Sequence, residues 1–81
     1  MTATIDSLAL RTVRVSVHPA AGGWEMACDL PVEPVYFRSG ASAEAAARSL
    51  AVRLSGEGND VKLTVHDRAA RPIATQRYFA Y

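Results

Sequence analysis

The sequence predicts an α+β domain: a mainly antiparallel sheet of four or five strands packed on one helix. Two observations lead to this class. Apolar and polar residues alternate, as in half-buried strands, in segments before and after residues 43–55. Within residues 43–55, apolar residues instead recur at helical spacing. The expected order is strand, strand, helix, strand, strand, with a further short strand before the helix left open.

The length of 81 residues allows a single domain. Residues 1–9 show no clear period, so we expect a mobile tail there, followed by one domain over residues 10–81. One helix covers only one face of a sheet, so the other face should meet water, a partner or a second copy. A core this small leaves a thin margin of stability, which dimerisation would supplement.

The first two predicted strands form a hairpin. In residues 13–18, valines alternate with polar residues, and in residues 24–30 one parity carries Trp24 and Cys28 together with Met26 and Leu30. Residues 19–23 hold a proline and two glycines, which end the first strand and favour a loop. The parity of Trp24 and Cys28 predicts that both side chains face the core.

Prolines and small residues frame the predicted helix. Pro31 and Pro34 restrict the segment before it to a short or edge strand over residues 35–38. Ser42 is expected to be the N-cap and Gly56 the residue that ends the helix.

Inside the predicted helix, a mostly alanine stripe should lie close to the sheet. Glu44 and Arg48 should form an ion pair one turn apart.

The last two predicted strands cover residues 61–66 and 73–79. Between them, Asp67 should start a turn by accepting a backbone N–H. The final strand carries polar and apolar residues on both parities, so its facing stays open; a bulge or an edge position would explain the mixture.

The chain lacks the motifs that carry catalysis. It has no Gly-x-Ser-x-Gly elbow, no phosphate loop and no dinucleotide fingerprint. Cys28 is expected inside, whereas His18 and His66 are expected on the opposite face, so they should not share a metal ion. We therefore expect a non-catalytic protein without metal or cofactor.

Charge and cysteine content indicate the cellular compartment to expect. The net charge is +1, and Cys28 is the sole cysteine, which favours a reducing compartment. The N-terminus lacks a basic segment leading into an apolar run, and no apolar run approaches the roughly 18 residues of a membrane helix. We expect a cytoplasmic protein without a membrane partner.

Two surfaces are candidates for binding. The C-terminal aromatic residues suit a protein partner or a homodimer interface: Tyr78, Phe79 and Tyr81. The alternative is nucleic acid, because residues 61–81 carry four basic residues and one acidic residue. The residues of that alternative surface are Arg14, Lys62, Arg68, Arg71 and Arg77.

Three motifs resemble a family of short bacterial proteins catalogued only as a domain of unknown function. They are Gly-Gly-Trp in the hairpin at residues 22–24, the alanine-rich helix at residues 43–54, and His-Asp-Arg at residues 66–68 before a late Tyr78. The resemblance covers most of residues 13–79. It implies a bacterial protein with the same order of elements, and it brings no assigned activity.

Other segments are similar to the N-terminal domain of HicB-type antitoxins, which also runs hairpin, short strand, helix. Residues 22–24, 29–31 and 39–45 match its glycine-aromatic, Asp-Leu-Pro and pre-helix segments. This resemblance implies a small toxin as protein partner. The DNA-binding tail that the family usually adds is not expected, because the sequence ends at Tyr81.

Overall fold

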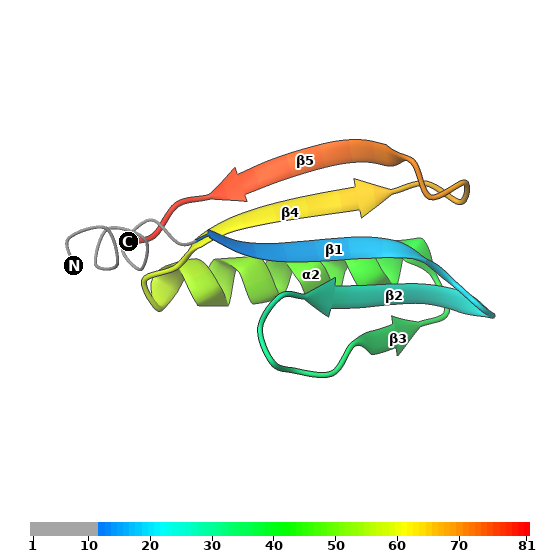
Figure 1. Cartoon of the computed structure of the whole chain (residues 1–81), viewed down its shortest axis with the longest axis horizontal. Helices are drawn as coiled ribbons and strands as arrows, with labels where there is room; N and C mark the ends of the chain where they lie inside the picture. Colours follow the sequence, from blue (N-terminus) through cyan, green and yellow to red (C-terminus); the bar gives the residue numbers. More distant parts are fainter. Residues whose placement is uncertain (1–11) are drawn as a thin grey trace, which may run out of the picture.

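The computed structural model describes residues 12–81 as a five-stranded sheet with one helix packed on one face (Figure 1). The elements in chain order are β1 (Thr12–Ala20), β2 (Gly23–Cys28), β3 (Val35–Phe37), α2 (Gly40–Gly56), β4 (Asp60–His66) and β5 (Pro72–Tyr78). The predicted α+β class, with one helix between two groups of strands, is confirmed. The predicted tail over residues 1–9 lies outside the described residues.

The sheet is mixed rather than purely antiparallel. Its strand order is β3-β2-β1-β4-β5. The pairs β2–β3, β1–β2 and β4–β5 are antiparallel, whereas the central pair β1–β4 is parallel. A parallel pair needs a long crossover, and here β2, β3 and α2 together provide it. Residues near the start of β1 therefore lie beside residues near the start of β4.

The core lies between α2 and the two central strands. The innermost side chains are valines and one leucine from the strands: Val13, Val15, Val17, Val61 and Leu63. They face three fully buried alanines of α2, which are Ala43, Ala47 and Ala51. Because alanine adds so little volume, the helix axis can approach the sheet closely. Trp24 closes one end of this core and is buried, as its parity predicts.

The helix begins earlier and ends later than predicted. Its N-cap is Ser39, whose Oγ accepts a hydrogen bond from the Ser42 backbone N–H at 3.1 Å, so the prediction of Ser42 as N-cap was wrong. Gly40 lies in the first turn, directly against Trp24. A Cβ atom at Gly40 would lie 3.2 Å from the Trp24 indole, so a larger residue would crowd that ring. At the other end Gly56 is helical, and Gly58 takes the positive φ of 97°.

The first hairpin is tighter than predicted. β1 continues through Pro19, which pairs with Trp24, and only Ala21 and Gly22 form the loop. Gly22 supplies the positive φ of 79° that this loop needs. β1 pairs with β4 only as far as Val17, so the missing N–H of Pro19 removes no bond from that ladder.

The second hairpin agrees with the sequence. Asp67 Oδ1 accepts the backbone N–H groups of Ala69 and Arg71 at 2.9 and 3.0 Å, which confirms Asp67 as the turn residue. An irregularity in the pairing between Val65 and His66 and the edge position of β5 explain the mixed pattern of that strand. In the described part of the chain, no helix is long and apolar enough to cross a membrane.

Candidate functional site

The sheet face opposite α2 collects polar side chains from all five strands. These side chains alternate along each strand with the residues of the core, so they share the uncovered face. Cross-strand pairing arranges many of them into rows that run perpendicular to the strands. We call this surface the open face.

One row of the open face carries three positive charges, and we call it the basic row. Arg14 of β1 pairs with Lys62 of β4, and Lys62 pairs with Arg77 of β5. Neighbouring strands lie about 4.8 Å apart, so adjacent members are close. Arg14 and Arg77 are exposed and Lys62 is half-buried. No salt bridge between residues 12–81 involves any member of the row.

Two carboxylates flank the basic row. Asp29 Oδ1 accepts the backbone N–H of Arg14 at 3.1 Å, and the Asp29 backbone N–H donates to the Arg14 carbonyl at the same distance. Asp60, two residues before Lys62, accepts the backbone N–H of Ala80 at 2.9 Å. Both carboxylates thus hold backbone groups in place. Asp29 lies beside Arg14 at the β2 end of the row, and Asp60 lies on the side of the row toward the start of β4.

A second row of the open face carries hydroxyl groups. Ser16 pairs with Thr64, and Thr64 pairs with Thr75. This hydroxyl row lies two residues along the strands from the basic row, a separation of about 7 Å.

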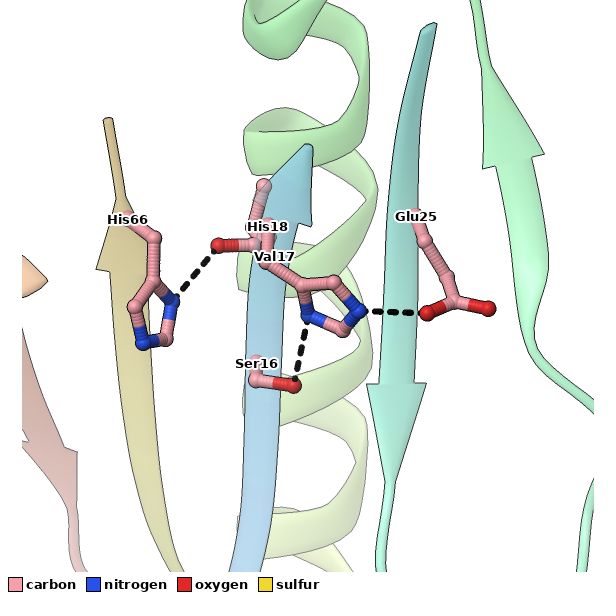
Figure 2. A network of polar contacts seen from close by, with 5 residues as sticks. All are labelled: Ser16, Val17, His18, Glu25 and His66. Atoms are coloured by element: carbon pink, nitrogen blue, oxygen red, sulfur yellow. Dashed lines mark hydrogen bonds and ion pairs between the residues drawn. The ribbon is translucent and has the colours of Figure 1, made fainter. Parts of the chain in front are cut away.

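A hydrogen-bonded network with two histidines lies on the open face, further along β1 from the basic row (Figure 2). His18 Nε2 contacts the Glu25 carboxylate across β1 and β2, and His18 Nδ1 lies 3.4 Å from Ser16 Oγ. His66 Nδ1 lies 3.0 Å from the Val17 carbonyl oxygen and donates to it, and the two imidazoles meet edge to face at 6.2 Å. Both histidines therefore lie on the face predicted for them, opposite Cys28.

A tyrosine on the neighbouring strand β3 affects the protonation of Glu25 in this network. Tyr36 of β3 pairs with Glu25. The Tyr36 hydroxyl has the largest effect on the Glu25 carboxyl and the His18 ring the next largest, and both lower its pKa. Reciprocally, the Glu25 carboxylate raises the pKa of Tyr36. Glu25 is thus held as a carboxylate.

Ser16, His18 and Glu25 have the order of a nucleophile, a base and an orienting acid. Such a group also needs donors for a developing oxyanion. β1 is a central strand, with β2 on one side and β4 on the other, so its backbone N–H groups serve the ladders. The backbone N–H groups of β1 are therefore occupied by the sheet and are not free to bind an oxyanion beside Ser16.

The residues of the predicted nucleic-acid surface separate into two groups. Arg14, Lys62 and Arg77 form the basic row, whereas Arg68 and Arg71 lie in the turn at the opposite end of β4. The Arg68 guanidinium lies 5.7 Å from the centre of the Trp24 ring, and Arg71 Nε binds Asp67 Oδ2 at 3.3 Å. Arg68 and Arg71 thus contact other side chains and do not extend the basic row.

The predicted aromatic surface is also divided. Tyr78 is half-buried and packs against the core, because it pairs with Val61 on the helix side of the sheet. Phe79 and Tyr81 are exposed, at 67% and 84%. Tyr81 lies beside the C-terminal end of α2, because its backbone N–H donates to the Ser55 carbonyl at 3.2 Å.

β5 forms one edge of the sheet. It spans seven residues, and all but Tyr78 are exposed. Among the described residues, no strand pairs with its outer side. The other edge, β3, has only three residues.

An apolar groove of about 360 Å³ lies on the helix side, between the second half of α2 and the chain around β3. Its apolar walls include Met26, Leu50 and Cys28, which is half-buried and not fully buried as predicted from the sequence. Within residues 12–81, no group of three or more His, Cys, Asp or Glu is placed to hold a metal ion.

No family model, curated protein or solved structure matches this chain.

The contact between His18 and Glu25 was not predicted from the sequence. The two residues become partners because the hairpin loop has only two residues, Ala21 and Gly22. A two-residue loop ending in glycine is a recognisable hairpin signal, so this register could have been found by extending the first strand through Pro19.

Proposed function

We propose that this chain is a non-catalytic interaction module that forms a homodimer through the edge strand β5. The observation that carries the proposal is the length and exposure of β5, which offers seven residues of backbone without an outer neighbour in the described structure. An edge of this kind pairs readily with another strand. A cytoplasmic setting agrees with the half-buried Cys28 as the sole cysteine.

The geometry of β5 selects a register. In a two-fold antiparallel pair one residue faces its own copy, and pairing of the whole strand Pro72–Tyr78 places Thr75 at that position. Arg77 then lies opposite Ile73 of the second copy, so the two arginines do not face each other. Since like charges directly opposite destabilise a sheet, this register is favoured over one centred on Arg77.

The exposed apolar side chain of Ile73 also favours this register. Ile73 is 62% exposed and is the unpaired residue at the irregularity opposite Val65 and His66. Pairing would cover it with the aliphatic part of the Arg77 side chain from the second copy. The aromatic residues Phe79 and Tyr81 lie beyond the paired segment.

A cysteine cross-link tests the proposal. In a Cys28→Ala background, Thr75→Cys should form an intermolecular disulfide under mild oxidation, because facing residues in a pair are within disulfide reach. Arg77→Cys is the matched control on the same strand and face, since its copy would be displaced by about 14 Å along the strands. Sedimentation equilibrium of the unmodified protein should give twice the mass of one chain.

Two results would overturn the proposal. One is a monomer mass at the highest soluble concentration, which would leave a different protein, such as the toxin implied by the antitoxin resemblance, as the partner to seek. The other is cross-linking of Arg77→Cys as fast as Thr75→Cys.

A further inference from the structure

We infer that the open face binds the phosphate backbone of a single-stranded nucleic acid, with the basic row as the phosphate site. This inference does not depend on self-association, because every residue it uses comes from one copy. The three cationic side chains of the basic row repel one another. Arg14, Lys62 and Arg77 are direct cross-strand neighbours, and no described ion pair neutralises them.

An unneutralised row of like charges lowers the stability of the sheet. A bound polyanion would reverse that cost, since each phosphate neutralised by a cation releases condensed counterions. The flanking carboxylates restrict the direction of binding. Asp29 sits beside Arg14, and Asp60 sits on the side of Lys62 toward the start of β4, so phosphates are expected on the side of the row that faces Thr64.

The hydroxyl row strengthens the assignment to a nucleic acid. Ser and Thr hydroxyls are common donors to phosphate and sugar oxygens. Ser16, Thr64 and Thr75 run parallel to the basic row, about 7 Å from it. A strand that crosses the sheet along the basic row would thus have hydroxyl donors along one side.

The shape of the site favours a single strand over a duplex. Reading a duplex requires a helix or a two-stranded ribbon that enters a groove, whereas the open face belongs to a five-stranded sheet. Flat sheets bind single strands by stacking bases on exposed aromatic rings. Phe79, two residues after Arg77, offers such a ring beside the basic row and is 67% exposed.

Salt-dependent binding tests the inference. Fluorescently labelled oligo(U) and oligo(dT), and a duplex of the same length, are titrated with the protein at increasing salt. Three phosphate contacts predict a slope of about −2 in log affinity against log salt for the single strands. Lys62→Gln and Arg77→Gln should each reduce the magnitude of that slope by about 0.7.

The matched control is Arg53→Gln, which removes one positive charge from α2, on the other side of the sheet. It should leave affinity and slope unchanged. Phe79→Ala should weaken binding about tenfold without changing the slope, because stacking is not ionic. The melting temperature of Lys62→Gln should equal or exceed that of the unmodified protein, which separates lost binding from lost folding.

Absence of binding at low salt would overturn the inference. So would an Arg53→Gln effect as large as that of Lys62→Gln, which would indicate a general charge effect. Tighter binding of the duplex than of either single strand would refute the single-strand assignment. The Thr75→Cys cross-link reports on self-association alone, so the two proposals fail independently.

Discussion

Two glycines show how local crowding decides whether a side chain is tolerated. A Cβ on Gly23 would lie 2.3 Å from the Phe37 carbonyl oxygen, because β2 and β3 approach closely there. A Cβ on Gly56 would lie 3.6 Å from the Tyr81 hydroxyl, an ordinary contact. The same substitution should therefore have opposite effects at these two positions.

We expect Gly23→Ala to lower the free energy of unfolding by roughly 1–3 kcal/mol, since backbone must move to remove the clash. Gly56→Ala should raise it by up to about 1 kcal/mol, because alanine favours the helical backbone. Urea denaturation of both variants measures the difference. A Gly23→Ala variant as stable as the unmodified protein would contradict the close approach of β2 and β3.

The contact of Glu25 with Tyr36 and His18 makes stability depend on pH. The pKa of Glu25 is lowered, so its carboxylate stabilises the folded state above the ordinary value of 4.5, and this contribution is lost as the pH falls through the lowered pKa. Glu25→Gln should flatten the dependence of the unfolding free energy on pH in that acidic range. Parallel curves for the variant and the unmodified protein would show that Glu25 is equally acidic in both states.

At the scale of the element, the start of α2 shows how capping outweighs periodicity. The apolar stripe places the first core alanine at Ala43, which made Ser42 the expected cap. The structure instead caps the helix with Ser39, and the first turn runs under Trp24 at Gly40. Apolar spacing reports only the buried turns of a helix, so an exposed first turn leaves no signal in it.

This assignment predicts unequal effects for two neighbouring serines. Ser39→Ala should cost about 1 kcal/mol, because the backbone N–H of Ser42 loses its acceptor. Ser42→Ala should change stability little, since alanine suits the helix interior. Thermal unfolding followed by circular dichroism compares the two variants. A larger loss of stability for Ser42→Ala than for Ser39→Ala would contradict Ser39 as the N-cap and favour Ser42.

At the scale of the whole molecule, strand order sets the distribution of local stability. β1 and β4 each have a neighbour on both sides and face the buried alanines of α2. β3 and β5 are the edges, and β5 is almost fully exposed.

Amide hydrogen exchange should follow this order. We expect the slowest exchange in β1 and β4, because their amides open only in global unfolding, and faster exchange in β3 and in the β5 amides that face outward. Raising the protein concentration should slow exchange in β5 selectively if the strand pairs with its copy. Slow exchange in β3 at every concentration would contradict the edge position of that strand.

The sequence by itself determined the type and order of the elements apart from the short strand β3, the buried side of β1, β2 and β4, and the turn at Asp67. Each of these follows from a period or a residue preference within about ten positions of chain. Only the tertiary structure decided that β1 and β4 are parallel neighbours. That pairing joins Arg14 to Lys62 across the sheet, separates Arg68 and Arg71 from them, and turns Tyr78 toward the core. Strand neighbours and register depend on how distant segments bury their apolar faces together, and a local pattern is compatible with several such pairings.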